Sequence, residues 1–279
     1  MRLGWGDTRV LDFSRPLVMG VINVTPDSFS DGGRFAGHGS AVDHGLALAA
    51  AGADLLEVGG ESTRPGAAPV ALGEELERVV PVIEALARRT RCPIGVDSSK
   101  VPVMAAALEA GAVLINDVTA LEGDPRAVEF LAGRSCPVVL MHKRGTPARM
   151  QDDPRYDDVL AEVYDYLAGR IRQCERHGLR RERLIVDPGI GFGKTTAHNL
   201  TLLRHLGVFR GLGVPLLLGV SRKRVVGDLT GVTEPDRRDP GSQALAALGA
   251  LQGAQILRVH EVGGTRQALA VAQGWRHAS

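Results

Sequence analysis

The segment Leu184-Ile185-Val186-Asp187 is a short apolar run that ends in a carboxylate. Such a run, without polar alternation, is typical of a strand buried on both faces, as in parallel sheets. The pattern occurs eight times, in residues 18–21, 55–56, 94–96, 113–115, 138–141, 184–186, 216–220 and 256–257. The polar residues that follow these runs are Asn23, Glu57, Asp97, Asn116 with Asp117, His142, Asp187, Ser221 with Lys223, and Arg258 with His260. The sequence therefore predicts eight parallel strands with polar carboxyl ends.

The stretches between these runs are long enough for helices, so the expected class is α/β with strand and helix alternating. Helical patterns are clearest in residues 73–89, 156–178 and 242–253. Dividing 279 residues by eight gives about 35 per unit, which agrees with a (β/α)8 TIM barrel of about 250 residues plus insertions. An open doubly wound sheet is the alternative, but it binds its ligand at a single switch point. We therefore predict one barrel domain over residues 1–279, with a short N-terminal β-hairpin in residues 1–13 closing its floor.

Composition limits the class of protein. The chain has 44% hydrophobic residues, 23% charged residues and a net charge of +1, which is typical of a soluble globular protein and suggests neither nucleic acid nor membrane as a partner. No apolar run resembles a signal peptide or approaches the ~20 residues of a membrane span, so a cytoplasmic location is expected. Cys92, Cys136 and Cys174 are too scattered for a zinc site and are expected to be reduced thiols.

Two glycine-rich segments follow the first two predicted strands, in residues 23–33 and 59–66. Both combine glycines with acids and hydroxyls, the first also with a phenylalanine and the second with an arginine. These are the ingredients of mobile lid loops over an anionic substrate. Ordinary solvated turns are the alternative, but two neighbouring loops at the catalytic face of a barrel favour a function.

Eight ordered motifs give the chain a resemblance to a known family. They are MGVINVTPDSFSDGG (19–33), GGESTRPG (59–66), VDSSK (96–100), LINDV (114–118), LMH (140–142), DPGIGFGKT (187–195), SRK (221–223) and RVH (258–260). The set resembles the bacterial dihydropteroate synthases over residues 18–260. That family condenses 6-hydroxymethyl-7,8-dihydropterin diphosphate with p-aminobenzoate, giving 7,8-dihydropteroate and diphosphate in folate biosynthesis.

The resemblance implies a pterin site at the barrel mouth. Asp187 matches the family's pterin-binding aspartate, and a carboxylate suits the N–H edge of the ring because it accepts two hydrogen bonds. Asp97 and Asn116 match residues that contact the other ring nitrogens, and Met141 is expected beside them. Lys223 matches a lysine near the ring carbonyl and the aminobenzoate. For either aspartate, a helix N-cap is the structural alternative.

The same resemblance implies a diphosphate site that uses Mg²⁺. Asn23 matches the family's magnesium ligand, and one side chain with phosphate oxygens and waters is a common arrangement for this ion. The expected diphosphate ligands besides Asn23 are Thr63, Arg64, Arg258 and His260. Arginine suits phosphate because its planar fork donates two parallel hydrogen bonds. A structural ion pair is the alternative for Arg258 and His260.

For catalysis, the resemblance implies a dissociative substitution, with Arg64 and Lys223 as further catalytic residues. Asp27 and Asp31 would stabilise a developing cation. The p-aminobenzoate ring would lie in a slot formed by Phe29, Pro65 and Phe192, and its carboxylate near the start of the helix at Lys223.

The sequence departs from the family at three positions, of which Ser98 in place of threonine is a conservative change. Arg224 stands where many members have a serine, so its contact with the substrate carboxylate is an open expectation. Glu57 stands where an aspartate is more usual and is assigned no role.

Other functions remain as alternatives. A corrinoid-type pterin methyltransferase shares a similar barrel, although methyl transfer has no diphosphate to hold. A catalytically silent pterin-binding or scaffold protein would lack loop residues such as Asn23 and Arg64, and both are present. The sequence Gly193-Lys194-Thr195 resembles the end of a P-loop, but position 188 is proline where the motif needs its first glycine. A homodimer is the expected assembly, with small-residue late helices as a possible interface.

Overall fold

The computed structural model describes residues 2–5, 9–24, 33–62, 66–146 and 149–278. Its main sheet has eight parallel strands in the order β8-β7-β6-β5-β4-β3-β10-β9. Their bounds are β3 Leu17–Asn23, β4 Leu55–Gly59, β5 Ile94–Asp97, β6 Leu114–Asp117, β7 Val138–Met141, β8 Leu184–Asp187, β9 Leu217–Gly219 and β10 Ile256–Val259. A parallel bridge between Val186 and Leu216 joins the two ends of this order. The predicted α/β barrel of eight strands is confirmed, and the open-sheet alternative is excluded.

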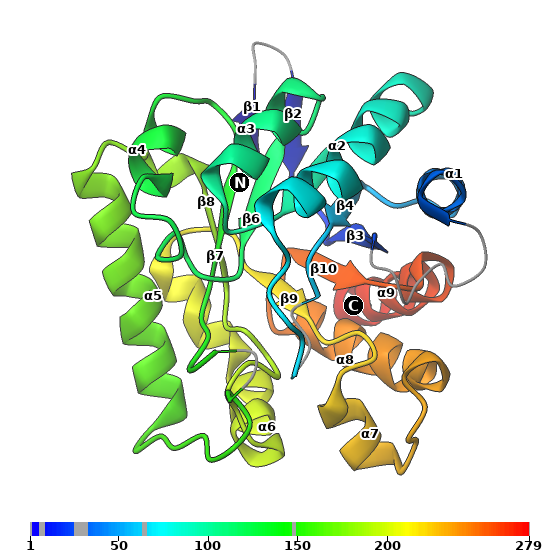
Figure 1. Cartoon of the computed structure of the whole chain (residues 1–279). Coiled ribbons are helices and arrows are strands. Elements are labelled where there is room, and N and C mark those ends of the chain that lie inside the picture. The colour runs from blue at the N-terminus through cyan, green and yellow to red at the C-terminus, as the bar shows by residue number, and fades with distance from the viewer. Residues whose placement is uncertain (1, 6–8, 25–32, 63–65, 147–148, 279) are drawn as a thin grey trace.

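Helices surround the strands (Figure 1). They are α1 Gly33–Ala50, α2 Leu72–Arg89, α3 Val101–Glu109, α4 Ala127–Ala132, α5 Val159–Arg176, α6 Thr196–Arg204, α7 Arg224–Thr230, α8 Asp239–Leu251 and α9 Val262–His277, with 3₁₀ turns at Arg181–Arg183, Leu206–Leu212 and Pro235–Arg238. Within the described ranges, no helix has the length and apolarity needed to cross a membrane.

The three predicted helices are present, and local chemistry explains their shifted ends. Helix α2 starts one residue before the predicted range. Helix α5 begins at Val159 rather than at residue 156, because the Asp158 side chain accepts hydrogen bonds from the N–H groups of Leu160 and Ala161 and caps the helix. Helix α8 begins at Asp239, three residues early, with a proline in its first turn, where the missing N–H costs nothing.

The N-terminal hairpin closes one end of the barrel, as predicted. Strands β1 (Arg2–Trp5) and β2 (Arg9–Asp12) pair antiparallel. Leu3, Leu11 and Phe13 are buried in one apolar cluster with the first residues of the barrel strands. In Figure 1 the hairpin (blue, top of the view) lies at the opposite end of the molecule from α7. The site must therefore form at the end away from the hairpin, where the strands finish.

Side chains alternate along each strand between the helices and the barrel interior. On β7, Val138 and Leu140 belong to the cluster that packs against the helices, whereas Val139 belongs to the interior cluster. The interior cluster is entirely apolar and consists of Leu3, Leu11, Phe13, Leu17, Met19, Leu55, Leu114, Val139, Ile185, Leu217 and Ile256. This apolar cluster forms the floor of the barrel. The next inward-facing position on each strand lies two residues further along, above the floor, and can hold a polar side chain.

Candidate active site

A second interior layer lies directly above the apolar floor. Each member lies two residues after a floor residue on the same strand, or at the same level on a neighbouring strand. The members are Glu57, Asp97, Asn116, Met141, Asp187, Gly219 and Arg258. Strand register places Asp97 beside Asn116 and Met141 beside Asp187. The period of two residues therefore gathers polar groups from most of the strands at one level of the barrel.

Glu57 and Arg258 organise one side of this layer. The guanidinium of Arg258 contacts the Glu57 carboxylate at 2.5 Å and that of Asp97 at 3.0 Å, and the Asn116 amide donates to Glu57 Oε1 at 2.9 Å. Burial and the neighbouring Glu57 carboxylate raise the pKa of Asp97 to about 8, although Arg258 acts in the opposite direction. The Oδ1 atom of Asn116 is buried and has no hydrogen-bond partner among the described residues. It is an acceptor available to a bound molecule.

Arg258 thus forms the ion pair that the sequence offered as its alternative role. Arg258, on β10, contacts one carboxylate on β4 and one on β5. Burial lowers the pKa of Arg258, but the two carboxylates raise it by more. Glu57, which sequence reasoning left without a role, is fully buried at the centre of this network. The signal that could have found it is its position two residues after the inward-facing Leu55. A role of Arg258 toward diphosphate stays a prediction.

Asp187 occupies the other side of the layer. Its side chain is buried, and Oδ1 accepts a hydrogen bond of 2.7 Å from the Gly189 N–H. Burial raises its pKa, and the ammonium of Lys223 is the largest effect in the opposite direction. The N-cap alternative is wrong for both aspartates, because the residues that cap α6 and α3 are Thr195 and Lys100. Neither carboxylate therefore caps a helix.

Lys223 extends toward Asp187 from the end of β9. Its Nζ donates to the carbonyl oxygen of Ile190 and lies 4.6 Å from the centroid of the Phe192 ring. Burial lowers the pKa of Lys223 to about 8, while Asp187 raises it. The structure therefore brings together Asp187, Phe192 and Lys223, as expected from the sequence.

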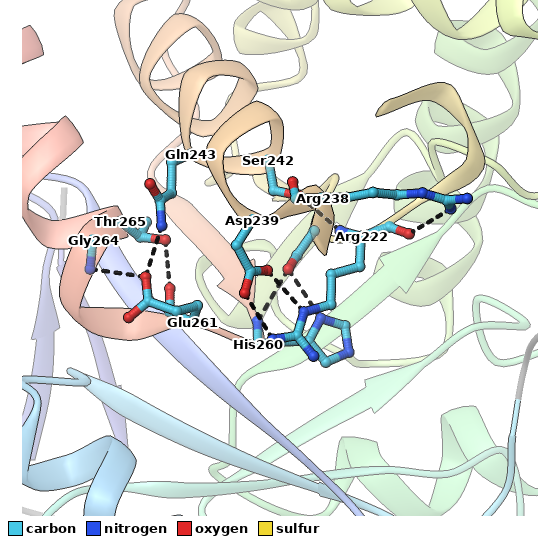
Figure 2. Close-up of polar contacts among 10 residues, drawn as sticks. Arg222, Arg238, Asp239, Ser242, Gln243, His260, Glu261, Gly264 and Thr265 are labelled. Atoms are coloured by element: carbon cyan, nitrogen blue, oxygen red, sulfur yellow. Dashed lines mark hydrogen bonds and ion pairs between the residues drawn. The ribbon is translucent and has the colours of Figure 1, made fainter. Parts of the chain in front are cut away.

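The turn that carries Lys223 is held by contacts that the sequence did not indicate (Figure 2). Arg222 has a φ of 59°, which is uncommon for a residue with a side chain. Its guanidinium makes two hydrogen bonds of 2.8 Å to Asp239, and its N–H donates to Ser242 Oγ at 2.9 Å. Arg238 donates to its carbonyl oxygen at 3.1 Å. Helix α8 and the turn before it therefore fix the geometry from which Lys223 projects.

The other predicted site residues within the described ranges lie at or just beyond the ends of strands. Asn23 is the last residue of β3 and is half-buried. The Nδ1 atom of His260 lies 2.9 Å from Ser221 Oγ, a pairing that sequence reasoning also missed. The side chain of Arg224 is 80% exposed and lies 3.6 Å from Asp228, one turn along α7. The predicted residues Asp27, Phe29, Asp31, Thr63, Arg64 and Pro65 lie outside the described residues.

The base of the second glycine-rich loop is tied to the barrel by charge. The Lys100 ammonium contacts the carboxylates of Glu61, on the loop, and of Glu75, on α2. The Glu75 carboxylate is buried, and a buried carboxylate needs a partner of opposite charge, which Lys100 provides. The loop therefore leaves the barrel from a fixed point.

No group of three or more His, Cys, Asp or Glu side chains among the described residues could hold a metal ion by itself. Near the rim, Asn23 supplies an amide oxygen, a hard ligand of the type that Mg²⁺ prefers. Because Mg²⁺ commonly binds through one or two protein ligands plus phosphates and waters, this donor set fits an ion carried by a diphosphate substrate rather than a permanent protein site.

Comparison with known proteins gives consistent similarities. The family described as "Pterin binding enzyme" matches residues 19–260. The dihydropteroate synthase of Escherichia coli (strain K12) is 49% identical over 263 residues, which are 94% of this chain and 93% of that protein. A structure of Xanthomonas albilineans dihydropteroate synthase with 4-aminobenzoic acid is 52% identical, with a TM-score of 0.92 over 97% of both chains. Another, in complex with 7,8-dihydropteroate, is 49% identical, with a TM-score of 0.89 over 97% of both chains.

Proposed function

Since this chain belongs to the pterin-binding enzyme family and has dihydropteroate synthases as its relatives over nearly its whole length, we propose that it condenses 6-hydroxymethyl-7,8-dihydropterin diphosphate with p-aminobenzoate. The products are 7,8-dihydropteroate and diphosphate, and the enzyme is a transferase. The observation that carries the proposal is the polar interior layer, in which two aspartates that cap no helix and an asparagine with an unpartnered acceptor lie at one level of the barrel.

The pterin ring binds within that layer. The Oδ2 atom of Asp187 can accept a hydrogen bond from an N–H of the ring, because the Gly189 N–H donates only to Oδ1. Asn116 offers its unpartnered Oδ1, and Asp97 contacts the ring from the adjacent strand. Met141 is buried next to Asp187 and supplies an apolar surface for the ring face. Polar contacts of this kind are strong here because water is excluded.

The p-aminobenzoate binds nearer the rim. The ring of Phe192 supplies one wall of the slot, and Lys223 lies over it. Phe29 and Pro65, which lie outside the described residues, would complete the slot. Arg224 is free to turn toward the substrate carboxylate, because its contact with Asp228 is exposed and such pairs contribute only about 0–1 kcal/mol.

The diphosphate and its Mg²⁺ bind at the rim opposite the floor. Asn23 would hold the Mg²⁺, and the residues that would bind the diphosphate are Asn23, Thr63, Arg64, Arg258 and His260. When bound, Mg²⁺ neutralises charge that develops on the leaving diphosphate. The chain's own contribution is to hold the anion with fixed donors and to exclude water.

Bond breaking precedes bond making in this site. The pterin methylene loses diphosphate and becomes cationic, and Asp27 and Asp31 stabilise this positive charge. The amine of p-aminobenzoate, held by the slot, then forms the new C–N bond and loses its proton. Orientation supplies much of the rate, because two substrates are fixed in one geometry.

The test measures diphosphate release from the dihydropterin substrate with Mg²⁺, with and without p-aminobenzoate, and detects dihydropteroate by mass. Product that needs both substrates supports the synthase. Tight pterin binding without condensation contradicts it and favours the corrinoid methyltransferase or a silent binding protein.

The assembly is a homodimer in the cytoplasm. Among the described residues, large apolar side chains that are more than half exposed are Leu229 on α7, Leu248 on α8, and Val271 and Trp275 on α9, as expected of an interface between copies. Light scattering during gel filtration tests this assembly, and a monomeric mass at micromolar concentration contradicts it.

A further inference from the structure

The segment from Gly189 to Gly193 is held by side chains along its whole length. Each of its five consecutive carbonyl oxygens accepts a hydrogen bond from a side chain. Lys194 Nζ donates to Gly189 at 2.9 Å and to Phe192 at 3.0 Å, and Lys223 donates to Ile190. The other two donors are Gln151, at 2.6 Å from the Gly191 oxygen, and Tyr156, at 2.9 Å from the Gly193 oxygen.

The backbone of this segment has a left-handed conformation at both of its end residues. Gly189 and Gly193 have φ values of 67° and 63°. A Cβ on Gly189 would lie 1.8 Å from the His142 carbonyl oxygen, and one on Gly193 would lie 2.1 Å from that of Arg144. The segment therefore packs directly against the chain that follows β7, which requires glycine at both positions.

Lys194 lies beneath this segment and is 2% exposed. Besides the two carbonyl oxygens, its Nζ lies 2.9 Å from Nδ1 of His142. Nζ also lies 3.5 Å from the His142 carbonyl oxygen, so four acceptors surround the three donors of a lysine ammonium. Burial lowers the pKa of Lys194, and burial with the adjacent ammonium lowers the pKa of His142 to about 2. A neutral His142 that accepts at Nδ1 carries its proton on Nε2.

We propose that Lys194 is a positioning residue for the condensation, because its ammonium draws Gly189, Phe192 and His142 together and so fixes the segment that carries the Phe192 wall. The inference rests on the proposed function. Lys194 is buried below the segment and acts through its neighbours. The same segment carries the Ile190 carbonyl that holds Lys223 and the Gly189 N–H that binds Asp187. One buried cation thus sets the relative placement of both substrate sites.

The first test compares Lys194→Met with a matched control, Lys143→Met, which removes a lysine two residues after β7 that has no role in this argument. Lys194→Met keeps the aliphatic stem and removes the three donors. We expect KM for p-aminobenzoate to rise at least tenfold in Lys194→Met and less than twofold in Lys143→Met. Equal KM values for wild type and Lys194→Met would overturn the proposal.

A rescue experiment separates positioning from packing. In Lys194→Ala, added propylammonium replaces the missing atoms together with the charge, whereas propanol fills the same space without it. We expect propylammonium, and not propanol, to lower KM for p-aminobenzoate severalfold. Equal rescue by both compounds would show that Lys194 only fills space.

Wild-type protein provides a test that does not depend on a variant folding. The ¹⁵N shifts of His142 report which ring nitrogen carries the proton, and protonated Nε2 is expected. A proton on Nδ1 would exclude donation from the Lys194 ammonium to this nitrogen and overturn the proposal, whether or not the protein makes dihydropteroate. Absence of product with protonated Nε2 would contradict the proposed function and leave the Lys194 clamp intact.

Discussion

Asp187 shows how a single residue is prepared for a ligand. One carboxylate oxygen is fixed by the Gly189 N–H, so the side chain cannot rotate, and the other oxygen remains available. Burial raises the pKa of this carboxyl, and the ammonium of Lys223 opposes that shift. A buried carboxylate with a fixed direction suits a ring edge that carries N–H donors.

Asp187→Asn tests this arrangement. The amide oxygen can still accept from Gly189, but its NH₂ group then replaces the available acceptor. Since a hydrogen bond to a charged group contributes about 1.5–3 kcal/mol, we expect pterin affinity to fall by about 10- to 100-fold. Calorimetric titration measures the change. Asp43→Asn, on the exposed face of α1, is the control and should bind normally; near-normal affinity in Asp187→Asn would contradict the assignment.

Lys223 predicts a pH dependence. Burial lowers its pKa to about 8, so the ammonium is present below that pH and is lost above it. We expect kcat/KM for p-aminobenzoate to fall above pH 8, because this ratio reports groups of the free enzyme. Rate measurements between pH 6 and 10 test this limb. Asp97, with a pKa of about 8, titrates in the same range, so the Lys223 contribution is the part of the fall that is lost in Lys223→Arg, where a guanidinium keeps its charge.

The places of several site residues were predictable, because each of them ends an apolar strand. Asp97, Asn116 and Asp187 follow directly from the apolar runs. Arg222 was not predictable, because its positive φ and its contact with Asp239 depend on where α8 packs. Interactions between residues far apart in the chain leave no pattern in either segment.

At the scale of elements, the hairpin β1–β2 acts as the floor of the barrel. Leu3 is 2% exposed and lies in the same cluster as the floor side chains of the strands. The sequence indicated a hairpin from its glycines, and the closed end of the barrel explains why it must be apolar on one face. Element ends were less predictable, because caps such as Asp158 act over single residues.

Leu3→Ala tests the floor. Removing a fully buried leucine typically costs about 2–5 kcal/mol, so we expect a loss of this size in the free energy of unfolding. Because the site lies at the opposite end, KM and kcat should change little at a temperature where the variant is folded. Urea denaturation with an activity assay measures both. Leu72→Ala, where the side chain is 41% exposed, is the control and should cost much less.

At the scale of the whole molecule, the sheet joins the two ends of the chain. β10 lies between β3 and β9, so the last strand completes the barrel around the first. Arg258 adds a polar connection from β10 to Glu57 and Asp97. The barrel cannot close before the chain is nearly complete.

A truncation after Leu251 tests closure. Loss of β10 and α9 leaves β3 and β9 with unpaired edges, which are templates for association with other chains. We expect the truncated protein to be insoluble or aggregated, as measured by sedimentation. A matched cut after Gly274 removes only exposed or terminal residues of α9, including Trp275, and should remain soluble. A soluble, barrel-like protein that ends at Leu251 would contradict this view of closure.

Within one strand, the lower inward-facing side chain belongs to the apolar floor and the upper one to the polar layer. This separation is useful for protein engineering. On β8, Ile185 lies in the floor and Asp187 in the polar layer, separated by only about 6.6 Å along the strand. A library that varies only the upper inward positions would therefore search for new ligands while leaving the folding core untouched. A library that varies only the floor would search for heat resistance without retuning substrate choice.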